Sequence, residues 1–287
     1  MHFRSLVLAA LALAPSALGQ IANSSYVTTE LASTLLQFRA AGLVPQYIPE
    51  ERIRLASSLS VSFGNVSAPL GATLARNDTQ EAPTLRMNYT QHVDSMDAFS
   101  SRAYTTLMVD MGAPGVGFPN GAVVRHYLSN NDTLTGSNGT VMSTGRAVTS
   151  YNGPAPPAGS GPHRYTLLVV AQPAGWMAPA NLSAPAPLVT DFQLNDYLNY
   201  AGLGQIIAAS YFIVEGASPT TASVSSTQAV PTASVQAAAS TISASLMSAY
   251  ASPTNAVTSM NRDAGVAMAP AAFAATLMAL VAGAALA

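Results

Sequence analysis

The segment Gly161-Pro162-His163-Arg164-Tyr165-Thr166-Leu167-Leu168-Val169-Val170 contains the most uniformly apolar run in the middle of the chain, residues 165–170. A run of this length and composition predicts a central strand that is buried on both faces. Because successive side chains on a strand point to opposite sides, His163 and Tyr165 should share one face while Arg164 occupies the other. The segment therefore predicts the middle of a sheet with polar groups at one of its ends.

Further strands are predicted on both sides of this segment. Residues that alternate in polarity or form short apolar runs between Gly, Pro and Asn lie at 59–63, 84–89, 103–110, 122–129 and 208–214. Helices are predicted at residues 28–41, which carry apolar side chains on one face, and from a cap at Asp191 to Tyr200. Many strands and few helices favour a mainly β domain, which we place at residues 23–215.

Polar side chains recur near the ends of the predicted strands. Asp110 closes one strand just before Gly112, and His126 lies within the next. His163 and Tyr165 follow a loop at residues 151–157. Imidazole and phenol groups can donate hydrogen bonds, so a pocket built from them could hold a small anion. A structural role is also open, because strand histidines often make only local hydrogen bonds and aspartate often caps a turn.

Three segments, in this order, resemble motifs of the phosphatidylethanolamine-binding protein (PEBP) family. Val109-Asp110-Met111-Gly112-Ala113-Pro114 is similar to the family's Asp-Pro-Asp-Ala-Pro signature. Arg125-His126-Tyr127-Leu128 is similar to its His-His-aromatic-Leu segment, and Gly161-Pro162-His163-Arg164-Tyr165 to its Gly-x-His-Arg-Tyr segment. With residues 192–215, which resemble the closing helix and strand, the likeness spans roughly residues 50–215.

This resemblance implies a PEBP-like fold with a large central β-sheet, a smaller sheet, a few peripheral helices and a small anion pocket. The residues that match family pocket positions are Asp110, His126, Pro157, His163 and Tyr165. The sequence departs from the family at Gly112, which replaces the second Asp, at Arg125, which replaces the first His, and at Ala155, where a pocket Gly is usual. Loss of a carboxylate and gain of a guanidinium should make the rim of the pocket more positive.

Three classes of function compete. The first is a binding protein for phospholipid head groups or other small phosphorylated or anionic ligands. The second, which some members of the resembled family represent, is an inhibitor of serine carboxypeptidases or a signalling regulator that acts through protein contacts. The third is a hydrolase or metal enzyme that uses Asp110, His126 and His163. The chain has no Gly-x-Ser-x-Gly or His-Glu-x-x-His segment, so we expect a binding protein that is not an enzyme and needs no cofactor.

Both ends of the chain carry the pattern of a processing signal. Residues 1–19 combine Arg4, a short apolar run and small residues before Gln20, which predicts a cleaved secretory signal peptide. Residues 261–287 end in an uncharged apolar run without a basic tail, which favours a glycosylphosphatidylinositol (GPI) attachment signal over a plain tail anchor. Asn261 is the expected attachment site. The alternatives are Ser259, Asp263 and Gly265.

The segment between domain and tail is predicted to be a stalk. Residues 216–260 contain no charged side chain and consist mainly of Ser, Thr, Ala, Val and Pro, a composition typical of disordered, O-glycosylated stalks. Acceptor triplets for N-glycosylation occur at Asn23, Asn65, Asn77, Asn88, Asn131, Asn138 and Asn181. We expect a secreted glycoprotein of fungal type, held at the extracellular face of the plasma membrane or in the cell wall through its lipid alone.

Composition excludes several other classes. The chain has no cysteine, so it carries neither a disulfide framework nor a zinc–thiolate site. It has no lysine, its eleven basic residues are scattered arginines, and its net charge is −2. The electrostatic footprint of a nucleic-acid-binding protein is therefore missing.

Overall fold

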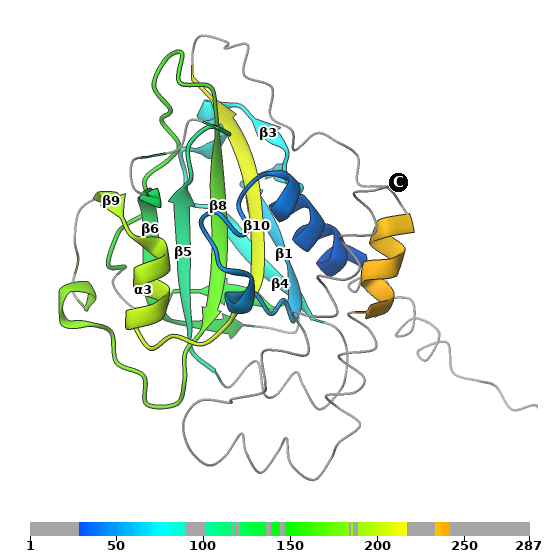
Figure 1. The fold of residues 1–287 in the computed structure, drawn as a ribbon. Coiled ribbons are helices and arrows are strands. Elements are labelled where there is room, and N and C mark those ends of the chain that lie inside the picture. The colour runs from blue at the N-terminus through cyan, green and yellow to red at the C-terminus, as the bar shows by residue number, and fades with distance from the viewer. Residues whose placement is uncertain are drawn as a thin grey trace, which may run out of the picture.

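The computed structural model describes residues 29–89, 102–115, 118, 121–135, 139–143, 147–183, 185, 189–216 and 233–241. Its centre is a sheet of ten strands, with helices outside (Figure 1). The sheet curls so that β1 (Ser57–Phe63) and β4 (Thr84–Tyr89) lie behind β8 (Pro162–Ala171) and β10 (Ile206–Glu215). The predicted mainly β fold class is confirmed. The expected signal peptide, the GPI signal with Asn261, and most of the stalk lie outside the described residues.

The strands form one hydrogen-bonded path in two parts. In the order β2-β1-β4-β7-β6-β5-β8-β10-β3, the long β6 belongs to both parts, because it pairs with β5 near its start and with β7 at its end. The short β9 pairs with β6. The strands are β1 (Ser57–Phe63), β2 (Val66–Ser67), β3 (Thr73–Leu74), β4 (Thr84–Tyr89), β5 (Tyr104–Asp110), β6 (Val123–Thr135), β7 (Thr140–Met142), β8 (Pro162–Ala171), β9 (Val189–Phe192) and β10 (Ile206–Glu215).

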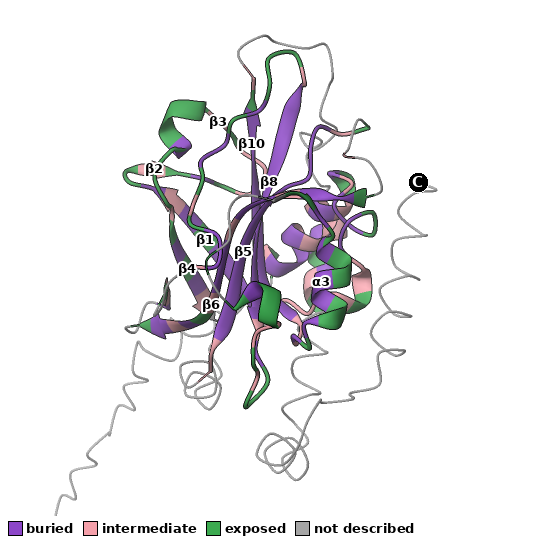
Figure 2. Cartoon of the chain, turned by 90° about the vertical axis from the view of Figure 1, so that its left-hand side faces the viewer, coloured by how far each residue is buried: buried purple, intermediate pink, exposed green. Residues whose placement is uncertain are grey.

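Strand β8 lies in the larger part of the sheet, antiparallel to both β5 and β10. All of its residues except Ala171 are buried, and Figure 2 shows the same burial along its neighbours. Leu167 and Val169 belong to an inner core between the two parts of the sheet. Leu168 and Val170 belong to an outer core beneath the helices. The prediction of a central strand here is confirmed.

Helices cover the outer face of the larger part. Residues 29–40 form a helix that ends just before Gly42, and Phe38 from this helix joins the outer core. Helix α3 (Leu194–Tyr200) contributes Leu194 and Leu198 to the same core. Short 3-10 helices are η1 (Glu50–Arg52), η2 (Arg76–Thr79) and η4 (Ala180–Leu182). The helices therefore close the side of the sheet that faces away from the inner core.

The start of α3 differs from the sequence-based expectation. Asp191 lies within β9, which pairs with the edge of β6, and the residue that precedes α3 is Gln193. The prediction that Asp191 caps this helix is wrong. Backbone groups of β6 offer partners to residues 189–192, and local sequence does not reveal that non-local pairing.

One part of the expected stalk has regular structure. Residues 233–241 form a helix, and its Val235 and Ala238 are buried against Leu31 and Ala32 of the helix at residues 29–40. Alanine has the highest helix propensity, and Val235 and Ala238 are three residues apart, so both lie on one helical face. The expectation of a disordered segment is therefore wrong for residues 233–241. Within the described parts of the chain, no helix is both long and apolar enough to cross a membrane.

Candidate functional site

A β-bulge in β6 orients His126. Met108 of β5 pairs with Tyr127, and the next residue, Val109, pairs with Arg125. His126 between them is therefore an extra residue of β6 that has no partner on β5. Such a bulge breaks the strict alternation of side chains and re-orients those beside it. The ring of His126 consequently contacts the ring of Tyr165 edge to face, with centroids 5.2 Å apart and planes at 82°. The bulge thus brings β6 into the site at the end of β5 and β8.

Asp110 and His163 form a buried pair in this site. Asp110 is the last residue of β5, and its Oδ2 accepts a hydrogen bond of 2.7 Å from Nδ1 of His163 at the start of β8. Its Oδ1 accepts a bond of 2.7 Å from the backbone N–H of Gly112. Gly112 has a φ of +69°, a conformation that glycine adopts without strain. Asp110 therefore both stabilises the turn and fixes the orientation of His163.

Tyr165 lies between the two histidines. Its ring is stacked against His163, with centroids 6.5 Å apart, and against Phe212 of β10 at 5.6 Å. The side chain is fully buried, and its hydroxyl has no hydrogen-bond partner. Burial raises the pKa of Tyr165 strongly, and the charge of Asp110 raises it further, while the backbone of Ala155 works against both. The phenol therefore keeps its proton, and although the Asp110 carboxylate and the Ala155 backbone lie near its hydroxyl, it makes no hydrogen bond of normal geometry.

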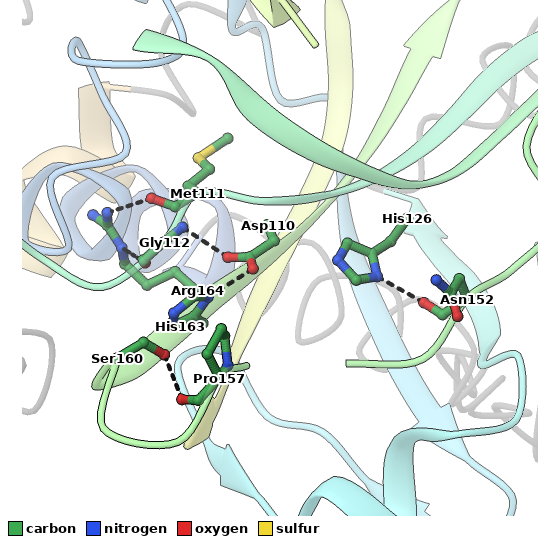
Figure 3. A network of polar contacts seen from close by, with 9 residues as sticks. All are labelled: Asp110, Met111, Gly112, His126, Asn152, Pro157, Ser160, His163 and Arg164. Carbon is green, nitrogen blue, oxygen red and sulfur yellow. Dashed lines mark hydrogen bonds and ion pairs between the residues drawn. The ribbon is translucent and has the colours of Figure 1, made fainter. Parts of the chain in front are cut away.

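His126 is held in one tautomer. Its Nδ1 lies 2.8 Å from the backbone carbonyl of Asn152, which can only accept, so Nδ1 carries the proton. Burial lowers the pKa of His126, although the Asn152 carbonyl and the charge of Asp110 offset part of this effect. His126 is therefore neutral near pH 7. Its Nε2 then holds a lone pair, and Figure 3 shows that nitrogen on the side of Asp110 and His163.

The hydrogen-bonding capacity of the site depends on protonation. Both histidines use Nδ1 for protein contacts, so each has only Nε2 left for a ligand. In the neutral ring Nε2 accepts a hydrogen bond, whereas in the imidazolium it donates one. The Tyr165 hydroxyl donates in either case. The sequence-based view of the imidazoles as ready donors therefore holds only after they take up protons.

Arg125 does not line this site. It is 2% exposed, its Nε donates to Thr149 Oγ1 at 2.8 Å, and its guanidinium lies 5.0 Å from the ring centroid of Phe192. Burial lowers the pKa of Arg125. Arg125 is on the face of β6 opposite to His126, so the part of the expectation in which its guanidinium makes the rim of the pocket more positive is wrong. The physical reason is the alternation of side chains before the bulge.

Arg164 supports the site from behind. As predicted, it points away from His163 and Tyr165. Its guanidinium donates to the carbonyls of Met111 and Gly112 (Figure 3) and to that of Ala41. It is almost fully buried, and burial lowers its pKa. Arg164 thereby holds the turn after Asp110 against the end of the helix at residues 29–40.

Pro157 occupies a different position from the other predicted site residues. It is exposed in the loop before β8, and its carbonyl accepts bonds from Ser160 N and Oγ at 3.1 and 2.7 Å. None of the hydrogen bonds or ring contacts found for the described site residues involves Pro157. The structure thus brings together Asp110, His126, His163 and Tyr165, and leaves Pro157 at the periphery.

Sequence reasoning gave no role to three residues that complete the site. Asn152 fixes the tautomer of His126, Phe212 stacks on Tyr165, and the ring of Phe118 meets His163 at 6.2 Å. Phe212 is the cross-strand partner of Tyr165 in register, so a correct pairing of β8 with β10 would have found it. The contact of Asn152 depends on the path of a loop and has no local signal.

Catalytic geometry is not visible among the described residues. Asp110, His126 and His163 do not form a group that could hold a metal ion. No described serine hydroxyl forms a hydrogen bond with either histidine, and Ser160 Oγ donates to the Pro157 carbonyl instead. What the described residues of the site do offer is a set of hydrogen-bond donors and acceptors, at Tyr165 and at Nε2 of both histidines.

The predicted glycosylation sites differ in accessibility. Asn88 is half-buried, and its amide donates to Ser58 Oγ at 3.1 Å and Ser60 Oγ at 2.7 Å. A glycan on Nδ2 would replace one of its two hydrogens, so at least one of these bonds would be lost. The acceptors with an exposed side chain are Asn65, Asn77, Asn131 and Asn181. Asn23 and Asn138 lie outside the described residues.

Comparison with known proteins gives three findings. Residues 65–212 match the family described as phosphatidylethanolamine-binding protein. The uncharacterized protein YLR179C of Saccharomyces cerevisiae is 25% identical over 182 residues, which cover 60% of this chain and 89% of that protein. The fold is similar to that of a carboxypeptidase Y inhibitor solved in complex with its cognate proteinase, with a TM-score of 0.52 and 20% identity. That likeness covers 64% of this chain and 95% of the inhibitor.

A phosphatidylethanolamine-binding protein from Plasmodium vivax is a more distant structural match. Its TM-score is 0.47 at 14% identity, over 63% of this chain and 96% of the Plasmodium protein.

Proposed function

Because this chain belongs to the phosphatidylethanolamine-binding protein family, we propose that its site binds a small phosphorylated or other anionic ligand, such as a phospholipid head group. The proposal rests above all on the Tyr165 hydroxyl, a buried donor without an acceptor between two histidines. An unpaired buried hydroxyl costs about 1–3 kcal/mol. An anion that accepts a hydrogen bond from this hydroxyl would remove this cost.

Protonation of the histidines would complete the binding site. On binding a phosphate-type group, Nε2 of His126 and of His163 become donors, and the adjacent Asp110 carboxylate balances part of the positive charge. Three donors would then face the oxygens of the ligand. In this proposal the protein binds and does not catalyse, since none of these groups activates a nucleophile.

Calorimetry on the secreted chain tests this function. Phosphate and phosphoethanolamine should bind the unmodified protein, and Tyr165→Phe should lower the affinity about tenfold or more through loss of one charge-assisted hydrogen bond. Tyr200→Phe is a matched control, because Tyr200 is 86% exposed on α3 and its hydroxyl lies outside the site. Equal affinities in the two variants, or no binding by the unmodified protein, would refute the proposal.

We further propose that the protein acts at the cell surface. The secretory signal at residues 1–19, the GPI signal at residues 261–287 and the acceptor triplets support this location. A fungal origin agrees with the similarity to a yeast protein. Phosphatidylinositol-specific phospholipase C should release the protein from intact cells if the anchor's inositol is not acylated. Detection of residues 271–287 in the mature protein would contradict the anchor.

An inhibitor of serine carboxypeptidases is the second candidate function. This function is favoured by the similarity in fold to the carboxypeptidase Y inhibitor, because the structural match covers 95% of the inhibitor chain. The unmodified protein should then slow peptide hydrolysis by a serine carboxypeptidase at a stoichiometric ratio. Inhibition that survives Tyr165→Phe would place this function on another surface, whereas inhibition without any anion binding would make it the leading candidate.

A further inference from the structure

A second β-bulge in β6 turns an acidic side chain into the inner core. Tyr104 of β5 pairs with Asp132, but Thr106 pairs with Ser129, so β6 has one more residue than β5 in this interval. Asn131 within the bulge has a φ of 59°. Asp132 is only 1% exposed. Bulges often re-orient side chains at functional sites. One bulge of β6 orients His126, and this second bulge orients the carboxylate of Asp132.

Asp132 lines a cavity of about 70 Å³ between the two parts of the sheet. Thr106 and Leu167 also line it, and they lie on the inner face of β5 and β8, beyond Asp110 and Tyr165 of the first site. Ser143, which is exposed, lines it as well. None of Asp110, His126, His163 and Tyr165 lines the cavity, so it is distinct from the first site.

The carboxylate in this cavity has no cationic partner among the described residues. Asp132 Oδ1 accepts a bond of 2.5 Å from Ser129 Oγ, and neither of the ion pairs found in the described part of the chain includes it. Burial raises the pKa of Asp132, while the hydroxyls of Ser129, Thr106 and Ser143 partly offset that rise. A buried carboxylate without a counter-charge is costly and favours a cation that enters the cavity.

A hydroxyl beside the carboxylate also lacks a partner. Thr106 is 1% exposed and lines the cavity. Its Oγ1 lies near enough to Asp132 to lower the pKa of that carboxyl, but it makes no hydrogen bond of normal geometry. A ligand with several N–H donors on one cationic nitrogen could form an ion pair with the carboxylate and, at the same time, donate a hydrogen bond to this hydroxyl. A metal ion fits less well, because calcium takes six to eight oxygen ligands, and most of the lining is apolar.

The size and apolar wall of the cavity narrow the ligand class. One water needs about 15 Å³ of such space, and benzene occupies an engineered cavity of about 150 Å³. The volume of this cavity lies between these two values and suits a ligand of two or three heavy atoms. Leu85, Met108 and Leu167 in its lining offer contacts to an alkyl carbon of that ligand. We propose that this cavity binds a short primary alkylammonium group, whose nitrogen pairs with Asp132 and donates to Thr106.

A calorimetric titration of the secreted chain with ethylammonium chloride tests the proposal. The buffer contains potassium chloride, so that the ionic strength stays nearly constant. The unmodified protein should bind ethylammonium, and Asp132→Asn should weaken binding about tenfold or more, because a charge-assisted contact is lost. Asp196→Asn, at an exposed position on α3, is the matched control and should leave the affinity unchanged. Tetramethylammonium, which has no N–H donor, should not compete.

Two further variants keep the test decisive. If Asp132→Asn does not fold, Thr106→Val serves instead, since it removes the hydroxyl, keeps the shape and should lower the affinity several-fold. Tyr165→Phe, in the first site, should leave ethylammonium binding intact, so failure of the anion proposal and failure of this one are distinguishable. The proposal is overturned if the unmodified protein does not bind ethylammonium, or if Asp132→Asn and Asp196→Asn bind it equally.

Discussion

Nδ1 of His163 lies 2.7 Å from Oδ2 of Asp110, so the carboxylate that ends β5 determines which nitrogen of the β8 histidine is left for a ligand. The other carboxylate oxygen is occupied by the N–H of Gly112. A ligand therefore meets Nε2 of His163, Nε2 of His126 and the Tyr165 hydroxyl, and the first two change from acceptor to donor when protonated.

The affinity for an anion should rise as pH falls. Sulfate is a suitable probe, because its own charge stays constant between about pH 5 and pH 8. The pKa of His126 in the free protein is lowered by burial, so an anion that needs the imidazolium must bring a proton with it. Linkage allows at most a tenfold gain in affinity per pH unit for each proton taken up. Calorimetry at several pH values should show this slope, and His126→Asn should reduce it; an unchanged slope would contradict the assignment.

Stability should show the opposite pH dependence in the absence of ligand. The pKa of His126 is lower in the folded chain than its ordinary value of 6.5. Below that value the unfolded state binds more protons, so the free energy of unfolding falls as pH falls through 6.5. Urea denaturation at about pH 7.5 and about pH 5 should reveal a loss that is smaller in His126→Asn, since that variant does not titrate.

Tyr165→Phe should not destabilise the protein, although it weakens anion binding. The hydroxyl has no hydrogen-bond partner in the protein, so its removal relieves the cost of burying it unpaired and should raise the free energy of unfolding by up to about 1–3 kcal/mol. Tyr151→Phe is the contrast, because that hydroxyl donates to the Thr79 carbonyl at 2.6 Å. Its loss should cost about 1–2 kcal/mol. A large destabilisation by Tyr165→Phe would show that its hydroxyl has a structural partner.

Arg164→Ala should destabilise the whole fold. Three carbonyls, on Ala41, Met111 and Gly112, would lose their donor, and a buried guanidinium would be replaced by a void. The expected cost is about 3 kcal/mol or more. Arg86→Ala, at an exposed position of β4, should change the free energy of unfolding by less than about 0.5 kcal/mol. Similar denaturation midpoints for both variants would exclude the proposed support role.

A chain that stops at Glu215 should be less stable than one that continues to Thr241. The longer chain keeps Val235 and Ala238 packed against Leu31 and Ala32, and their loss exposes apolar surface worth about 1–2 kcal/mol. Urea midpoints of the two chains measure the difference. Val235→Ser in the longer chain should reproduce part of it. Equal midpoints for all three would mean that the helix at residues 233–241 adds nothing to the fold.

The sequence by itself determined the strands that bury both faces and the identity of the polar groups at their ends. Residues 165–170 are apolar except for Thr166, so their position at the centre of a sheet follows from local composition. The opposite orientations of His163 and Arg164 follow from the period of a strand. Motif order across residues 109–165 also sufficed for the family.

Only the tertiary structure decided how those groups face one another. Strict alternation does not predict the bulges at His126 and before Asp132, because a bulge arises from the register between β5 and β6. The Asn152 carbonyl that fixes the His126 tautomer, and the cavity at Asp132, likewise bring together residues far apart in the chain. Local sequence sets which face a side chain prefers, whereas hydrogen-bond register and packing between distant strands set what it meets there.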